Sequence, residues 1–122
     1  MNAEMMAFFC GRPLEQALWL EMDAQCQKRL DTYEIRVSKT QLSLFSKCMF
    51  ACISHPRKKS QQGMVVSFGL PVRVESPRIW QVSEPYPGRW THHVLISSSE
   101  QLDDELFHWL SAAQSFAKQK KR

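Results

Sequence analysis

The sequence predicts an α+β domain: an antiparallel sheet of about five to six strands, with an N-terminal helix pair and a C-terminal helix packed on it. Residues 13–30 and 98–117 repeat apolar residues every three or four positions, as amphipathic helices do. Between them, residues 33–96 alternate apolar and polar residues in short runs, which is typical of strands. At 122 residues the chain is expected to form a single domain, 1–122.

The N-terminal helix pair is predicted from two segments separated by a glycine. Residues 3–9 are apolar, and Gly11 ends this short segment. Pro13 suits the first turn of the second helix, because its missing N–H has no partner to lose there. The second helix is expected over about 17 residues with Glu15 on its polar side. Its apolar stripe comprises Leu14, Leu18, Met22, Cys26 and Leu30.

The strands are predicted from a change to a period of two after Thr32. Short polar turns separate the runs, which favours antiparallel neighbours because parallel crossovers need a dozen or more linking residues. His55 and Pro56 end the third run, and a polar loop follows. The expected strands are residues 33–37, 42–45, 49–53, 64–70, 79–82 and 89–96, with residues 84–88 forming a turn.

The C-terminal helix is expected to begin at Ser98 or Ser99. Ser98 and Gln101 fit a capping box, in which each side chain bonds the other residue's backbone N–H. The acidic residues that follow suit the positive start of a helix. The apolar stripe comprises Leu102, Leu106, Trp109, Leu110, Ala113 and Phe116. The basic tail 118–122 is expected to fray.

The net charge of +4 is concentrated in the middle of the chain. Residues 1–31 contain three Lys or Arg and five Asp or Glu, residues 32–96 contain nine and three, and residues 97–122 contain four and four. The three segments therefore carry −2, +6 and 0. A basic central segment either attracts an anionic partner or is a solvated surface, and the sequence leaves both interpretations open.

Composition and cysteine placement indicate a cytoplasmic protein with reduced thiols. The 43% hydrophobic and 23% charged residues are globular values. The first ten residues lack the cationic start of a signal peptide, and no run approaches the ~20 apolar residues of a membrane span. Cys48 and Cys52 would lie about 13 Å apart on a strand, too far for a disulfide, so buried thiols are expected.

Two arginines beside a proline-rich loop form the candidate site. Arg78 and Arg89 flank residues 79–88, and a hairpin there would let their guanidiniums approach one another. Paired guanidiniums need an anion. That anion is either an external phosphate or carboxylate, or an internal acid such as Glu75, Glu84 or one at the start of the last helix.

The adjacent histidines are expected on opposite faces of the last strand. His93 shares a face with Arg89 and Thr91, whereas His92 faces the core. The two imidazoles therefore cannot chelate one metal together, and no third ligand has suitable spacing. Neither a metal nor a cofactor is expected.

Several segments carry a resemblance when taken together: VSKTQLSLF, MFACIS, SFGL, SPRI, EPYPGRWTHHV and QLDDELFHWLSAA. The chain resembles, over residues 5–117, an uncharacterised bacterial family of domains of unknown function, number five-six-five-five. The resemblance implies a compact α+β domain and brings no activity with it. The positions that match the family's polar motif are Lys39, Thr40, Gln41, Ser76, Arg78, Arg89, His92 and His93.

The function predicted first is a small cytoplasmic binding module for an anionic small molecule. Its candidate ligand-binding residues are Arg78, Arg89, His93, Lys39, Thr40, Gln41 and Ser76. An alternative is an enzyme in which His93 is the acid or base while the arginines hold phosphate or carboxylate. Nucleic-acid binding through loop 57–59, Arg36, Lys47 and the basic tail ranks last. No membrane association is expected, and the oligomeric state is not indicated.

Overall fold

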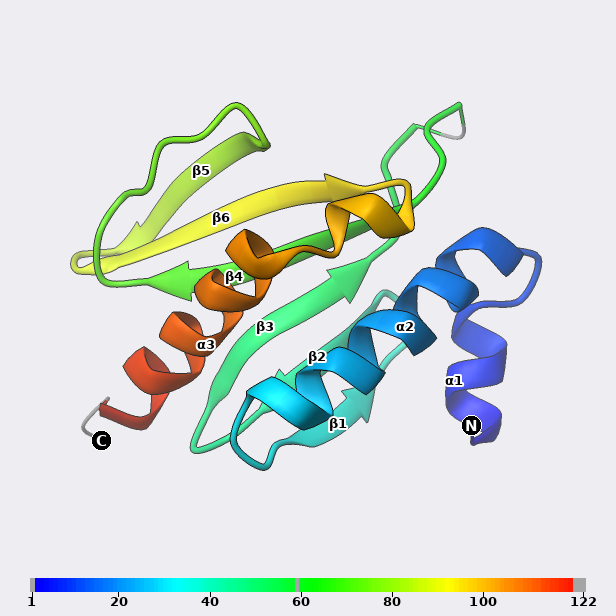
Figure 1. The fold of residues 1–122 in the computed structure, drawn as a ribbon, viewed down its shortest axis with the longest axis horizontal. Coiled ribbons are helices and arrows are strands. Elements are labelled where there is room, and N and C mark those ends of the chain that lie inside the picture. The colour runs from blue at the N-terminus through cyan, green and yellow to red at the C-terminus, as the bar shows by residue number, and fades with distance from the viewer. Residues whose placement is uncertain (1, 59, 120–122) are drawn as a thin grey trace.

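The computed structural model describes residues 2–58 and 60–119 as two layers, a six-stranded antiparallel sheet with helices on one face (Figure 1). The helices are α1 (Ala3–Phe8), α2 (Pro13–Arg29) and α3 (Asp104–Gln119), with a 3-10 turn at Ser99–Gln101. The strands are β1 (Glu34–Val37), β2 (Gln41–Phe45), β3 (Met49–Ser54), β4 (Met64–Leu70), β5 (Ile79–Tyr86) and β6 (Arg89–Ile96). The α+β prediction, with its N-terminal helix pair and C-terminal helix, is confirmed.

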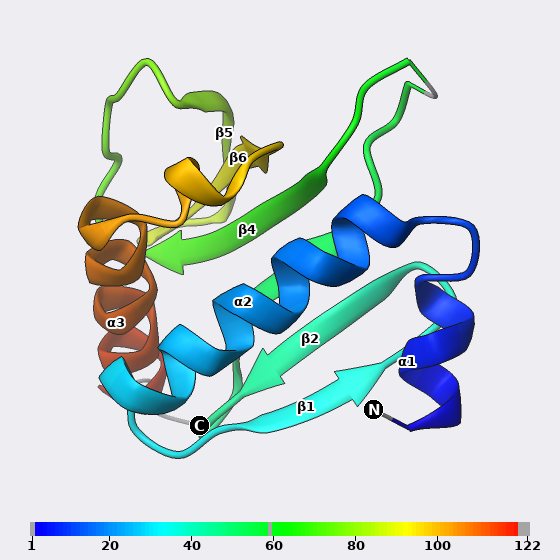
Figure 2. The ribbon, with the colours of Figure 1, turned by 45° about the vertical axis from the view of Figure 1, so that its right-hand side comes forward.

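The strand order is β1-β2-β3-β4-β6-β5, and every neighbouring pair is antiparallel. The order departs from the chain order only at the end, where β6 lies between β4 and β5. Helices α2 and α3 lie on the same side of the sheet, and α1 packs near β1 and β2 (Figure 2). The sheet thus has a helix-covered face and an open face.

The core lies between the sheet and the helices. Strand residues that alternate toward the helices include Leu44, Ile53, Val66 and Phe68, all at most 1% exposed. Every residue of β4 is buried, including those that face away from the helices. The open face is therefore concave around β4.

Helix α2 buries a slightly different stripe from the expected one. Leu14 is 38% exposed, whereas Trp19 and Glu15 are buried. Glu15 was expected on the polar side, but its carboxylate bonds Arg12 Nη1 at 2.7 Å and His55 Nδ1 at 2.8 Å. The His55 ring stacks on Phe8 at 4.3 Å, so this ion pair joins the helix pair to the end of β3.

Two boundaries also differ from the prediction. Strand β5 runs to Tyr86 rather than Val82, because it is an edge strand in which Pro85 loses no ladder hydrogen bond. The turn shrinks to Pro87 and Gly88, where Gly88 takes φ 83°. The capping box of Ser98 and Gln101 is present, but it caps the 3-10 turn. Lys118 belongs to α3, and residues 120–122 of the predicted tail lie outside the described part.

Candidate functional site

The hairpin β5–β6 forms, but the prediction that it brings Arg78 and Arg89 together is wrong. Ile79 pairs with Val94 at one end of the hairpin, whereas Tyr86 pairs with Arg89 at the other. The five residue steps from Arg89 to Val94 separate these ends by about 17 Å. The two guanidiniums also lie on opposite faces of the sheet, so they cannot hold one anion between them.

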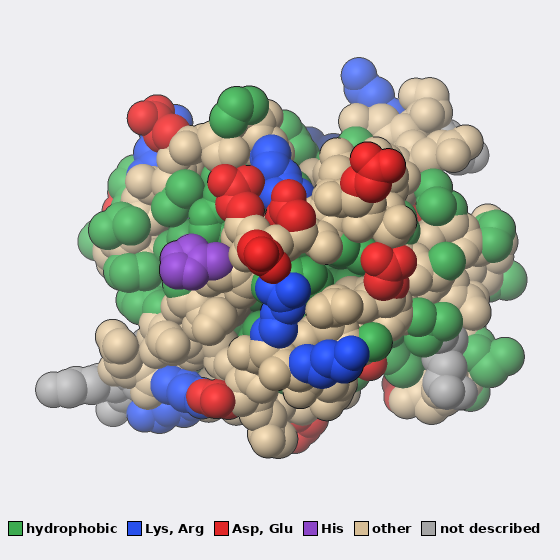
Figure 3. Space-filling view, in the orientation of Figure 1, with side chains coloured by type: hydrophobic (Ala, Val, Ile, Leu, Met, Phe, Trp, Pro, Cys, Tyr) green, Lys and Arg blue, Asp and Glu red, His purple; other side chains and the backbone are tan. Residues whose placement is uncertain are grey.

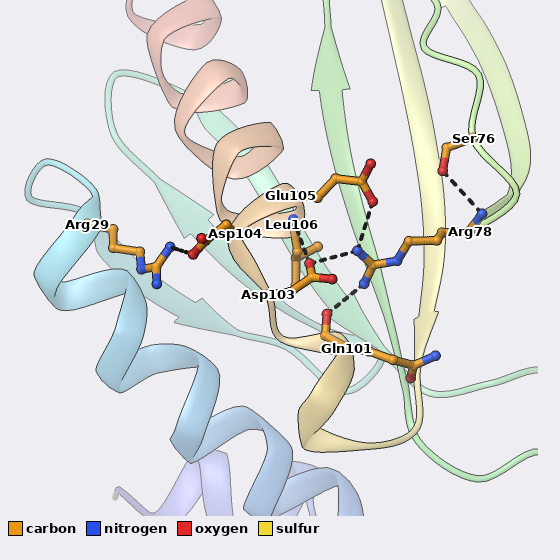
Figure 4. Close-up of polar contacts among 8 residues, drawn as sticks. All are labelled: Arg29, Ser76, Arg78, Gln101, Asp103, Asp104, Glu105 and Leu106. Carbon is orange, nitrogen blue, oxygen red and sulfur yellow. Dashed lines mark hydrogen bonds and ion pairs between the residues drawn. The ribbon is translucent and has the colours of Figure 1, made fainter.

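Arg78 is engaged by the start of α3 (Figure 4). Its Nη1 lies 2.8 Å from Asp103 Oδ1 and 3.1 Å from Glu105 Oε1, and its Nη2 donates to the Gln101 carbonyl at 2.6 Å. Burial opposes the charge of Arg78, but the hydrogen bonds that it donates to both carboxylates raise its pKa. Burial likewise opposes ionisation of Asp103, but the contact with Arg78 lowers its pKa. The anion that Arg78 needs is thus supplied by the acidic residues at the start of α3, and Arg78 stabilises the fold.

Arg89 lies on the open face with no ion pair to a described carboxylate. Its guanidinium rests against Gly69: a Cβ on that glycine would lie 2.6 Å from Arg89 Cζ. Because Gly69 has no side chain, the Arg89 side chain can lie flat against the sheet at this position. The guanidinium of Arg89 stays charged at any physiological pH, and no described carboxylate neutralises it.

Two adjoining hollows on the open face share Cys52, Ser67 and Thr91, and together we call them the open-face groove. The first has a volume of about 530 Å³ and is lined by Arg57, Lys58 and Gln61 on one side and by β5 on the other. The second has a volume of about 440 Å³ and extends toward Arg89 and Tyr86. Even without the second hollow, the first hollow is large enough to be a small-molecule site.

A row of polar residues crosses the sheet, and its members from β3, β4, β5 and β6 line the groove. The strand register aligns Arg36, Ser43, Cys52, Ser67, His93 and Gln81, one from each strand. Ser67 Oγ lies 2.7 Å from His93 Nδ1. Burial first and the charge of Arg57 second lower the pKa of His93, so its ring is neutral near pH 7.

The charges that line the groove are all positive. Arg57 and Lys58 lie at one end of the groove, and Arg89 lies at the other. Neither hollow has an Asp or Glu among its described lining residues. Trp80, half exposed at 51%, leans over the first hollow with its ring 5.6 Å from the His93 ring. Cations at both ends and apolar surface between them suit an anion with an apolar body.

The two histidines separate as predicted. His92 is fully buried on the helix-covered face, stacked on Phe68 at 5.3 Å. Its Nε2 accepts the Val74 N–H at 2.9 Å, while its buried Nδ1 has no partner among the described residues. His93 faces the groove.

The other predicted site residues are scattered. Gln41 lines the first hollow, where its Nε2 donates to Ser43 Oγ at 2.9 Å. Lys39 lies beside α1 in a separate hollow, and Thr40 belongs to the same turn, its N–H bonded to Ser38 Oγ. Ser76 precedes β5 and accepts the Arg78 N–H at 3.3 Å. Of the seven candidates, the groove thus gathers Gln41, Arg89 and His93.

Sequence reasoning missed Cys52, Ser67, Trp80 and the Arg57–Lys58 pair as groove residues. A hint was present, since Ser67 interrupts an otherwise apolar strand, and a polar residue inside a buried strand needs a partner. Its partner could not be inferred, because the register between β4 and β6 is not encoded locally.

Within residues 2–58 and 60–119, no group of three or more His, Cys, Asp and Glu side chains is placed to hold a metal ion. In the same part of the chain, no helix has both the length and the apolar character that a membrane crossing requires. All four cysteines are free, and Cys26 is the most buried of them.

Comparison with known proteins identifies a family. The family model described as "Domain of unknown function (DUF5655)" matches residues 20–117, from the middle of α2 to near the end of α3. The match includes the whole sheet and therefore the floor of the groove. Searches of curated proteins and of solved structures found no match.

Proposed function

Because the chain belongs to the DUF5655 family, whose description assigns no activity, we propose from its geometry that the open-face groove binds an anionic small molecule. One observation carries this proposal: Arg57, Lys58 and Arg89 line a concave site whose described lining residues include no carboxylate. Arg78, by contrast, has two carboxylates within 3.1 Å. The positive charge of the groove is therefore available to a ligand.

The chemistry of the lining narrows the ligand. Arginine offers a planar fork of donors that matches phosphate and carboxylate groups. Val65, Leu95 and Trp80 supply apolar surface next to the cations, and Gln81 and Thr91 supply neutral polar groups. A phosphate or carboxylate attached to an aromatic or aliphatic body fits this lining better than a bare inorganic ion.

Titration with phenyl phosphate, followed by the amide and indole N–H signals in NMR spectra, tests the proposal. We expect the Trp80 indole and the amides of β4 and β6 to shift, with a dissociation constant below about 1 mM. Arg89→Met and Arg57→Met should each weaken binding about tenfold or more, because each removes a charge-assisted hydrogen bond. Arg78→Met is the matched control, since Arg78 lies on the other face, and should bind as the wild type does.

Two outcomes would contradict this assignment. Equal loss of binding in all three arginine variants would indicate a general charge effect rather than a site. Tighter binding of a single-stranded oligonucleotide, with an affinity that falls steeply with salt, would favour the nucleic-acid alternative.

A second candidate, an enzyme, rests on the 2.7 Å contact between Ser67 Oγ and His93 Nδ1. A neutral imidazole in this position is a general base for whatever the cations hold. A screen of chromogenic phosphate and carboxylate esters tests it. Turnover that disappears in His93→Gln and persists in His108→Gln, an exposed imidazole on α3, would support the enzyme. Turnover that is unchanged in His93→Gln would exclude His93 as acid or base.

A further inference from the structure

Cys52 occupies the centre of the groove. It lines both hollows, between the Arg57–Lys58 end and the Arg89 end. Its thiol is partly accessible, unlike that of Cys26, which is fully buried. The register places Cys52 directly opposite Ser67, and Ser67 directly opposite His93. Side chains directly opposite in adjacent strands have Cβ atoms about 4.5–5.5 Å apart, so Ser67 is the neighbour of both Cys52 and His93 on the open face.

The three groups can pass a proton in one direction. In the neutral tautomer with the proton on Nε2, His93 accepts the Ser67 hydroxyl hydrogen at Nδ1, which leaves Ser67 Oγ able to accept from the Cys52 thiol. Burial raises the pKa of Cys52, whereas the interaction with Ser67 and the charge of Arg89 act in the opposite direction. The resting group is therefore a thiol, and it becomes a nucleophile when the relay removes its proton.

We propose that Cys52 is the nucleophile of the open-face groove, that Ser67 and His93 relay its proton, and that its partners are small anionic electrophiles. The choice of anions rests on the proposed function, because the same cations would hold the reagent. In the step, the sulfur of Cys52 bonds the electrophilic carbon and the leaving group departs with its electron pair. The thiol proton moves to Ser67 Oγ, and the Ser67 proton moves to His93 Nδ1.

The other cysteines provide internal comparisons. Cys10 is exposed beyond α1 and belongs to neither hollow. Burial raises the pKa of Cys26 to about 12, which makes it unreactive near neutral pH. Cys48 lines the second hollow, but its thiol points to the Ala117 carbonyl at 3.5 Å. Cys10 is therefore the reference for an ordinary exposed thiol in the same molecule.

Alkylation with iodoacetate, which is anionic, and iodoacetamide, which is neutral, tests the proposal on the full chain, with each cysteine followed by peptide mass spectrometry. The ratio of the iodoacetate rate to the iodoacetamide rate should be about threefold or more higher at Cys52 than at Cys10, because nearby cations attract the anion. The reaction releases the thiol proton and iodide as the S–C bond forms, so its rate depends on how readily the relay takes up that proton.

His93→Gln is the sharpest variant, because glutamine can still accept from Ser67 and cannot take up the proton. We expect it to slow Cys52 about tenfold with both reagents and to leave Cys10 unchanged. Wild-type Cys52 should lose reactivity as the pH falls through the His93 titration, and His93→Gln should lose that step. Ser67→Ala should slow Cys52 similarly, and Ser67→Thr, which keeps the hydroxyl, should restore most of the rate. His108→Gln is the matched control.

The outcomes separate the two proposals. A Cys52 rate that is unchanged in both His93→Gln and Ser67→Ala would overturn the relay, whether or not phenyl phosphate binds. A rate that depends on His93 while Arg89→Met and Arg57→Met leave the iodoacetate preference intact would support the relay and overturn the anion site. Unfolding curves of each variant check that the compared chains are folded. Slower alkylation of all four cysteines in a variant would indicate a general structural effect and overturn the assignment of the relay.

Discussion

Arginine and histidine have different contacts on the two faces of the sheet. On the helix-covered face, Arg78 is surrounded by the carboxylates of the α3 start, where acidic and basic side chains gather (Figure 3). On the open face, Arg89 has no described carboxylate beside it. The histidines repeat the contrast: His92 supports the fold from the core, and His93 contacts Ser67 in the groove. Adjacent residues on one strand thus have opposite roles.

The physical reason lies in the helix layer. The start of α3 places acidic residues next to its own positive end, and they also neutralise the arginine that packs there. The open face receives no helix and no helix start. Arg57, Lys58 and Arg89 on that face have no ion pair with a described carboxylate, which is why we place the proposed site there.

The largest expected effect separates the two histidines. His92→Ala should lower the free energy of unfolding by about 2–4 kcal/mol, because it leaves a cavity against Phe68 and removes the acceptor of the Val74 N–H. His93→Ala, on the open face, should cost less than about 1 kcal/mol. Urea unfolding measures both values, and equal losses would contradict the distinction between the faces.

The two arginines should separate stability from binding. Arg78→Met should cost about 1–2 kcal/mol of unfolding free energy, since it releases two partly exposed carboxylates and a backbone acceptor. Arg89→Met should leave stability nearly unchanged and weaken phenyl phosphate binding. Thermal unfolding combined with the NMR titration measures both. A stability loss in Arg89→Met as large as that in Arg78→Met would show that Arg89 also serves the fold.

Acid should act first through His92 and His93. Burial is the first cause that lowers the folded-state pKa of His92, with the charges of His93 and Arg73 adding to it. Burial and Arg57 lower that of His93. The unfolded chain titrates near pH 6.5, so below that pH it binds protons that the folded chain does not. The free energy of unfolding is therefore at its full value above about pH 6.5. It falls on acidification, by up to about 1.4 kcal/mol per pH unit for each histidine.

Urea unfolding at a series of pH values checks this sign, and His92→Gln isolates one contribution. The variant should flatten the pH dependence between the unfolded and folded pKa values of His92. A slope of the same size in the variant would show that other groups, such as carboxylates, dominate the acid response.

The smallest expected effect on stability concerns Gly69. An added Cβ would lie 2.6 Å from Arg89 Cζ, so Gly69→Ala should displace this flexible guanidinium rather than the backbone. We expect the free energy of unfolding to change by less than about 1 kcal/mol, since alanine also restricts the unfolded chain. Phenyl phosphate affinity should fall several-fold. Unchanged affinity would show that the observed position of Arg89 is not needed for binding.

Local patterns predicted most of the fold. Pro13, the apolar stripes and the Ser98–Gln101 capping box depend on residues close in the chain, and they placed the helices. Alternation placed the strands and also assigned His92 and His93 to opposite faces. The errors at Glu15 and β5 arose where a distant partner decided the outcome: His55 for the buried carboxylate and the edge position for Pro85.

The sequence by itself determined the elements, the basic centre of the chain and the face of each strand residue, because these depend on neighbours within a few positions. Only the tertiary structure decided which strands are neighbours and which side chains they bring together. The order β4-β6-β5 sends Arg78 to the start of α3 and leaves Arg89 on the opposite face. The same register aligns Cys52, Ser67 and His93 across three strands. Such alignment depends on how separate strands pair, and a shift of one residue would reverse every side chain.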